Sequence, residues 1–226
     1  MSPKSRQQPP ADHVQEIMRR LVREFPDVVL FGGWATYIRT GLAKSHDIDV
    51  IVDHSTLDRL RGKYELSPSR HIAGQKFELK LEGVTVDVYP VYQSRLGQRL
   101  QVPVEALINH SEQIDHVRVL SAEAQFVAKM AALLDRPDTL PGEKDRQEMF
   151  ALLNTGKSMD FKVIADLLDR AGWKPEQRAN LLGSTFDLLE ETPDLTQRNR
   201  AALRIIRSRA IEAGRAIDGQ DREPER

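Results

Sequence analysis

The stretch FGGWATYIRTGLAKSHDIDVIV, residues 31–52, contains the pattern that decides the fold. The apolar run VVLF that leads into it stops at Gly32-Gly33, as a buried strand does at a tight turn. The residues WATYIRT then predict a short helix closed by Gly41. Apolar and acidic residues alternate over residues 46–53, which predicts a second strand. The order is therefore strand, glycine turn, helix, strand.

Two aspartates of the second strand are candidate metal ligands. Asp47 and Asp49 share one face because side chains alternate along a strand. Their Cα atoms should lie about 6.6 Å apart, from where two carboxylates can converge on ions roughly 3.5–4 Å apart. We expect two Mg²⁺ ions here, with Mn²⁺ as the alternative. An isolated acid-x-acid pair is commonly the wet side of an amphipathic strand, but aspartate is a poor strand former and this strand follows a glycine turn.

The glycine turn is a candidate phosphate site. Gly32 and Gly33 stand between a strand and a helix, where backbone N–H groups and a helix N-terminus can face a phosphate. Glycine lets that phosphate approach closely. The alternative is an ordinary tight turn. Ser45 could contact the same phosphate or simply start the second strand.

A third acid, Asp87, lies in VTVDVYP with a clean apolar face opposite it. Residues 76–82 and 84–89 flank Gly83 and predict a hairpin. If the Asp87 strand pairs with the Asp47 strand, three carboxylates crowd one site, and their repulsion raises their pKa values unless cations are present. Asp87 is then a third metal ligand or the base that deprotonates an attacking hydroxyl; the alternative is a solvent-facing residue.

The whole chain is expected to have an α+β fold. A core over residues 11–120 should contain a mixed twisted sheet flanked by helices, and a helical bundle lobe should follow over residues 121–213. Residues 1–10 and 214–226 are polar and without apolar periodicity, so we expect them to be disordered. Helices are predicted at 11–25, 55–62, 121–136, 142–153, 161–171, 175–190 and 193–213, and a further strand at 117–120.

Composition excludes several classes of protein. The 226 residues contain no cysteine, so disulfides, thiolate metal sites and cysteine nucleophiles are excluded. The net charge of −1 gives no global sign of nucleic-acid binding. No apolar run approaches the roughly 20 residues of a membrane helix, and the first residues lack the apolar stretch of a signal peptide. We therefore expect a cytoplasmic protein without a membrane partner.

The glycine turn followed by acid-hydrophobic-acid resembles the signature of the polymerase-beta-like nucleotidyltransferase superfamily. Thirteen residues separate Gly33 from Asp47, which lies within the usual spacing of that signature. The pattern GGWA followed by K-S-x-D-I-D most resembles the AbiEii-type branch, whose members commonly act as toxins of type IV toxin-antitoxin or phage-defence systems. The resemblance covers roughly residues 28–153.

A second block, AKMAALLDRPDTLPGEKDRQEMFALL, adds to this resemblance. The branch tends to carry a helix with Lys and Arg and then a Lys-Asp-x-x-Asp motif. Lys129 and Arg136 are two helical turns apart and could both face a triphosphate. Lys144 and Asp145 match the later motif, but Glu148 replaces its last Asp. Taken singly, Lys129 could be a snorkelling surface lysine and Asp145 a first-turn helix acid.

The resemblance implies an enzyme of the EC 2.7.7 type that moves a nucleoside monophosphate from an NTP to an acceptor. Asp47, Asp49 and Asp87 would hold metal, and Lys129 and Asp145 would serve catalysis. The nucleotide would be bound by Gly32, Gly33, Ser45, Lys129 and Arg136.

AbiEii-like toxins resemble enzymes that modify tRNA acceptor ends, so tRNA or another RNA is the expected acceptor and a cognate antitoxin a candidate partner. Alternatives are a nucleotidyltransferase for antibiotics or proteins, and an inactive binding or regulatory module of the same fold. The last helix could bind an RNA backbone or present a solvated face, and the second is favoured because its arginines are spread around the helix. These are Arg198, Arg200, Arg204, Arg207, Arg209 and Arg215.

Overall fold

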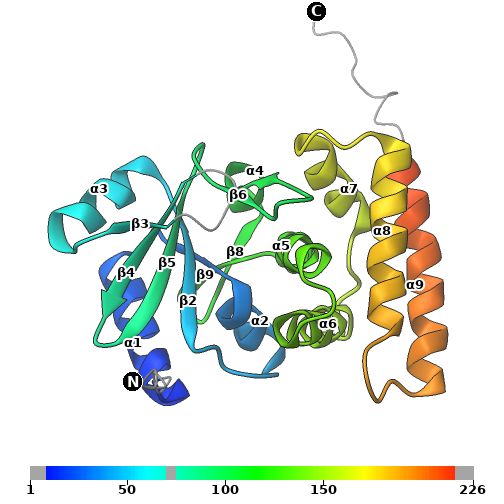
Figure 1. Ribbon diagram of the computed structural model, residues 1–226, viewed down its shortest axis with the longest axis horizontal. Coiled ribbons are helices and arrows are strands. Elements are labelled where there is room, and N and C mark those ends of the chain that lie inside the picture. The colour runs from blue at the N-terminus through cyan, green and yellow to red at the C-terminus, as the bar shows by residue number, and fades with distance from the viewer. Residues whose placement is uncertain (1–8, 70–74, 217–226) are drawn as a thin grey trace, which may run out of the picture.

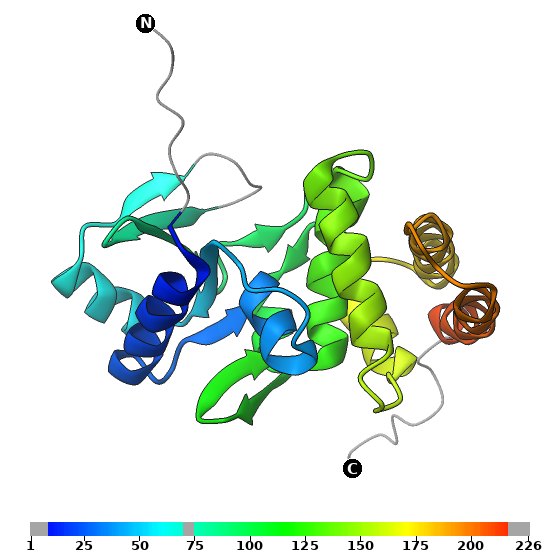
Figure 2. The same cartoon turned by 90° about the horizontal axis from the view of Figure 1, so that it is seen from below.

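The computed structural model describes residues 9–69 and 75–216, and within them the chain has the expected α+β fold, with helices on both faces of a mixed sheet (Figures 1 and 2). The disorder predicted for residues 1–8 and 217–226 lies outside the described residues. No helix among the described residues is both long and apolar enough to cross a membrane.

A sheet of seven strands has the order β3-β4-β5-β2-β1-β9-β8. Most neighbours are antiparallel, but β2 and β5 are parallel, as are β1 and β9. The sheet is therefore mixed, as predicted. Its strands are β1 (Val29–Phe31), β2 (Asp47–Val52), β3 (Ser67–Ser69), β4 (Lys76–Leu81), β5 (Val84–Pro90), β8 (Ser111–Ile114) and β9 (Val117–Leu120).

The helices follow the predicted order, with one short addition before β8. They are α1 (Ala11–Glu24), α2 (Gly32–Thr40), α3 (His54–Lys63), α4 (Val104–Ile108), α5 (Ala122–Asp135), α6 (Leu140–Leu153), α7 (Phe161–Arg170), α8 (Pro175–Glu190) and α9 (Gln197–Arg215). Helices α8 and α9 lie side by side at the end of the molecule away from α1 (Figures 1 and 2). A small hairpin is formed by β6 (Arg95–Leu96) and β7 (Val102–Pro103).

Several boundaries differ from the predicted ones by a few residues, and helix caps explain two of them. Strand β2 ends before Asp53, whose side chain accepts a 2.7 Å hydrogen bond from the Thr56 N–H and caps α3. Helix α9 starts after Thr196, which caps it in the same way. This helix continues to Arg215, so the first two residues of the predicted disordered tail are helical.

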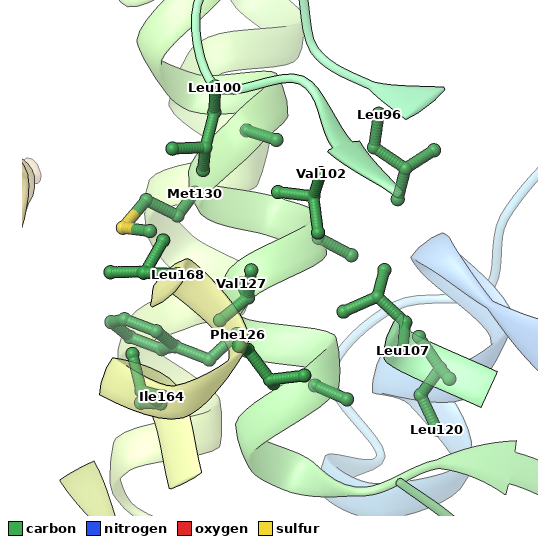
Figure 3. Close-up of a cluster of buried hydrophobic side chains, with 14 of the residues drawn as sticks. Leu96, Leu100, Val102, Leu107, Leu120, Phe126, Val127, Met130, Ile164 and Leu168 are labelled. Atoms are coloured by element: carbon green, nitrogen blue, oxygen red, sulfur yellow. The ribbon is translucent and has the colours of Figure 1, made fainter. Parts of the chain in front are cut away.

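Strand alternation divides the apolar side chains between two cores. Ile48 and Val50 of β2 belong to a cluster with α1 and α3, whereas Ile51 belongs to a second cluster that includes α5 to α9. In the second cluster, Phe126 and Met130 of α5 lie against side chains of α7 (Figure 3). Apolar contact is thus continuous between the sheet and the later helices, and the division near residue 120 stays a prediction. The face of β2 that carries Asp47 and Asp49 is the face toward α5.

Candidate active site

The acidic face is built by two parallel strands. Strand β2 pairs with β5 so that Asp49 lies directly opposite Asp87. Asp47 lies two residues before Asp49 and therefore on the same face of β2. The pairing of these two strands, which could be stated from the sequence only as a condition, is present. Three carboxylates from strands about 4.8 Å apart therefore share one face of the sheet.

Two of the three carboxylates have a polar partner nearby. The Ser45 hydroxyl donates to Asp47 Oδ1 at 2.6 Å, which places Ser45 beside the acids. The Lys76 Nζ lies 2.7 Å from Asp87 Oδ2, and both side chains are largely buried. Asp87 Oδ1 is buried and has no hydrogen-bond partner among the described residues. Lys76 was not found from the sequence because it lies outside every motif, on β4.

The acidic face is short of positive charge. Burial raises the pKa of Asp49 well above its usual range, and the neighbouring charges of Asp47 and Asp87 raise it further, against smaller opposing effects of Lys129 and Lys76. Burial also raises the pKa of Asp87, although Lys76 opposes this. A cation at this face would relieve both effects.

The acids do not form a complete metal site as they stand. Within residues 9–69 and 75–216, no three His, Asp or Glu side chains are arranged to hold an ion jointly. Asp87 is engaged by Lys76, so it would have to exchange that ammonium group for a metal. Asp47 and Asp49 carry no such lysine contact among the described ion pairs. The all-oxygen donor set is the kind that Mg²⁺ prefers.

The glycine turn lies directly against the acids, and both positions require glycine. Gly32 has a φ of +67°, and an added Cβ there would lie 2.2 Å from Asp49 Oδ2. At Gly33 a Cβ would lie 2.6 Å from the Ser45 hydroxyl oxygen. Any side chain at these positions would push Asp49 or Ser45 aside. The structure therefore brings the turn, Ser45 and the acidic face together.

The Gly32 N–H already has a partner within the protein, since it donates to Gln125 Oε1 at 3.2 Å. The N–H groups of this turn that have no partner inside the helix therefore begin with Gly33, in the first turn of α2. The role of Gly32 in binding phosphate stays a prediction. Gln125 was missed because a glutamine inside an apolar helix belongs to no motif.

Helices α5 and α6 supply a buried charge cluster. The Lys129 Nζ lies 3.0 Å from Asp145 Oδ1 and also pairs with Glu148. Arg136 donates through Nε and Nη2 to Asp145 Oδ2 at 3.0 and 2.8 Å. The Lys144 Nζ lies 3.7 Å from Glu148 Oε1. The contacts of Lys129 and Arg136 link the two helices beside the acidic face, whereas the contact between Lys144 and Glu148 lies within α6.

This charge cluster excludes the alternative interpretations of Lys129 and Asp145 that the sequence left open. Lys129 is only 7% exposed, so it is not a snorkelling surface residue. Burial acts to lower its pKa, but the charges of Glu148 and Asp145 outweigh burial and raise it, which keeps the ammonium group protonated. Asp145 is buried in the second turn of α6 and is not a first-turn acid. Glu148 has a defined place as a partner of Lys129.

Two adjoining clefts open over these residues. The larger has a volume of about 820 Å³ and is lined by Gly33, Ser45, Lys144 and Asp145 among others. The smaller has about 360 Å³ and is lined by Gly32, Lys76, Asp87 and Tyr89 among others. Both are lined by Asp47, Asp49, Lys129 and Arg136. Every site residue proposed from the sequence thus lines one cleft or both.

No family model and no curated protein matches the chain. Among solved structures, a nucleotidyltransferase-like antigenic protein from Paracoccidioides brasiliensis is similar, with 16% identity, a TM-score of 0.47, and coverage of 94% of this chain and 95% of that one. JHP933 from Helicobacter pylori is 13% identical with a TM-score of 0.46, over 89% and 94% of the two chains. A candidate nucleotidyltransferase from Thermotoga maritima is 16% identical with a TM-score of 0.41, over 55% and 87%. Similarities at this level assign neither a family nor an activity to the chain.

Proposed function

We propose that the chain is a metal-dependent nucleotidyltransferase that moves a nucleoside monophosphate from an NTP to an acceptor hydroxyl. The observation that carries the proposal is the meeting of two clefts at Asp47, Asp49, Lys129 and Arg136. Paired carboxylates, a glycine turn at a helix N-terminus and cationic side chains are the parts that transfer of a phosphoryl-type group requires.

Asp47 and Asp49 are the proposed Mg²⁺ ligands, with Asp87 as the third. The fit is supported by the raised pKa values of Asp49 and Asp87 and by the unpartnered Asp87 Oδ1. The Lys76 ammonium group shows that a positive charge is accommodated at Asp87. Bound Mg²⁺ would neutralise negative charge on the phosphate oxygens.

The larger cleft suits the triphosphate. Gly33 brings the N-terminus of α2 to this cleft, and Ser45 adds a hydroxyl beside it. Arg136 and Lys144 are partly exposed cations that also line this cleft. Lys129 stays charged beneath them and holds Asp145 in place. Together these groups would orient the NTP and offset its charge.

The smaller cleft suits the acceptor because Asp87 lines it. In the proposed reaction an acceptor hydroxyl gives its proton to a carboxylate, with Asp87 as the proposed base, and its oxygen attacks the α-phosphorus. The new O–P bond forms as the bond from the α-phosphorus to the bridging oxygen breaks. Pyrophosphate leaves with that oxygen, and the nucleoside monophosphate stays on the acceptor.

For the acceptor we propose tRNA or another RNA, with the chain acting as a toxin of the AbiEii type and an antitoxin as partner. The support is the sequence resemblance of the turn and the second block. The arginines of α9 add no support, because three of them pair with acids of α8: Arg204 with Glu190, Arg207 with Asp187 and Arg215 with Glu176. Antibiotic and protein acceptors remain alternatives, as does an inactive binding module.

The test is transfer of label from each of four α-labelled NTPs to total tRNA, to protein and to aminoglycosides, with Mg²⁺ or Mn²⁺ and with EDTA. Asp47→Asn and Asp49→Asn should fold and lose transfer. Asp58→Asn is the matched control, because Asp58 is an exposed acid of α3. Full transfer by both site variants would defeat the proposal, and no product from the wild type with any acceptor would favour the binding module.

A further inference from the structure

One buried side chain holds both polar groups of Gly32. Gln125 is fully buried, its Oε1 accepts from the Gly32 N–H at 3.2 Å, and its Nε2 donates to the Gly32 carbonyl oxygen at 2.7 Å. Thr36 completes the arrangement, since its hydroxyl donates to the same carbonyl oxygen at 3.1 Å and accepts from Gln125 Nε2 at 3.0 Å. We call these contacts the glycine clamp.

The glycine clamp acts at the point where the turn touches the acids. Gly32 has a left-handed φ of +67°, and its missing Cβ leaves room for Asp49 Oδ2, 2.2 Å from where that atom would be. Any shift of the Gly32 backbone therefore changes its spacing from Asp49. The clamp fixes this spacing through two hydrogen bonds that a fully buried amide can make with no competition from water.

The same helix places a second site residue. Gln125 precedes Lys129 by four residues on α5, so the two side chains lie on one face of that helix, a single turn apart. Gln125 contacts the turn, while Lys129 contacts Asp145 and lines both clefts. Helix α5 thus sets the distance between the glycine turn and Lys129.

We propose that Gln125 is a positioning residue for nucleotidyl transfer, fixing Gly32 against Asp49 and α2 against Lys129. This inference rests on the proposed function. Gln125 lines neither cleft and so acts through Gly32 without touching substrate. Its loss should lower kcat with little change in the KM for the NTP, because the groups that bind the triphosphate remain while their alignment is lost.

The first test compares Gln125→Leu with Thr185→Val. Thr185 is also fully buried, and its single hydroxyl bond goes to the Leu181 carbonyl in α8, away from the clefts. Both variants are measured at a temperature where circular dichroism shows each fully folded. We expect kcat to fall at least about tenfold in Gln125→Leu and to stay near the wild-type value in Thr185→Val. An unchanged kcat in folded Gln125→Leu would overturn the inference.

The second test uses Gln125→Glu and covers the case in which Gln125→Leu does not fold. A protonated carboxyl keeps one acceptor and one donor for Gly32, whereas a carboxylate has no donor for the Gly32 carbonyl. Burial favours the protonated form, so the rate relative to wild type at the same pH should recover as the pH is lowered. If the ratio of the Gln125→Glu rate to the wild-type rate did not change with pH, the result would contradict the glycine clamp.

A third measurement separates this inference from the proposed function. Hydrogen exchange at the Gly32 amide, followed by NMR, requires no substrate. It should be much faster in Gln125→Leu, whose side chain has no acceptor for the Gly32 N–H, than in wild type, while amides of α8 keep their wild-type rates. Absence of transfer by the wild type defeats the function, whereas unchanged Gly32 exchange defeats the clamp.

Discussion

Gly32→Ala offers the sharpest perturbation of the site, because a single methyl group should displace one candidate metal ligand. The added Cβ would lie 2.2 Å from Asp49 Oδ2, whereas ordinary contact begins at 3.4 Å. The carboxylate or the turn must therefore move by about 1.2 Å, the difference between these two distances. Misplacement of about 1 Å costs on the order of 100-fold in rate, so we expect labelled NMP transfer to fall by about that factor.

Gly41→Ala is the matched control. Gly41 has a φ of +68°, nearly that of Gly32, but an added Cβ there meets nothing within 4 Å. Both variants should lose about 1–2 kcal/mol for a left-handed alanine, and Gly32→Ala should lose about 1–3 kcal/mol more for overpacking. Urea unfolding measures the loss of stability, and the transfer assay measures the rate. Equal rates, or equal losses of stability, in the two variants would refute the reasoning.

A double-mutant comparison identifies the clashing atom. In an Asp49→Ala background the carboxylate is absent, so the extra destabilisation of Gly32→Ala over Gly41→Ala should largely vanish. If the extra loss persists in that background, the strain comes from elsewhere in the turn.

Three further outcomes are expected. Mg²⁺ at 100 times its Kd should stabilise the wild type by about 2.7 kcal/mol and so raise its Tm, but it should leave the Tm of Asp49→Asn unchanged. Equal shifts of Tm in a thermal scan would count against metal binding at Asp49. Asp53→Ala should lower the free energy of unfolding by about 1 kcal/mol at neutral pH. The backbone bond from Thr56 lowers the Asp53 pKa below 3.8, so this stabilisation is present above that pH and should fade in urea titrations as the pH falls through the lowered pKa. Lys129→Met should cost about 3–5 kcal/mol because it leaves Glu148 and Asp145 buried without their lysine, and a loss below about 1 kcal/mol in denaturant unfolding would contradict that pairing.

The central pattern of the fold could be predicted because its signals are local. The strand before Gly32, the helix closed by Gly41 and the alternation of β2 each follow from residues within one element. The pairing of the Asp87 strand with β2 could only be stated as a condition from the sequence, and the register of β2 and β5 fulfils it. The face that each of these strands turns toward the core could be predicted because only one orientation of the strand buries its apolar side chains.

The short elements could not be predicted because their signals are weak. Strand β8 has the sequence SEQI and lies at the edge of the sheet, where it pairs only with β9. Because little of it is buried, its sequence shows no clear alternation of apolar and polar residues. Its turn is formed by Asp115 and His116, both with positive φ and without the glycine that usually marks such a hairpin. Hairpin β6–β7 has two residues in each strand, too few for periodicity.

Contacts between distant elements account for the rest. Lys76 and Gln125 are ordinary residues of a strand and a helix until the fold sets them beside Asp87 and Gly32. Nothing in the residues around them indicates those partners. Motif positions such as Lys129 and Asp145 were found, but their contact with each other follows only from the packing of α5 on α6.

The parallel pairing of β2 and β5 also bears on how the molecule matures. The two strands of a hairpin can pair as soon as both have been synthesised. Strand β2 can pair with β5 only after α3, β3 and β4, which lie between them in the chain, have been synthesised. The hydrogen bond between Gly32 and Gln125 can form only later, after Gln125 has left the ribosome. Contacts so distant in sequence form slowly, because a long loop must be closed before they are gained. A nascent chain therefore contains Asp47 and Asp49 well before Asp87 and Gln125 have been synthesised, so the proposed active site is completed only at a late stage of synthesis.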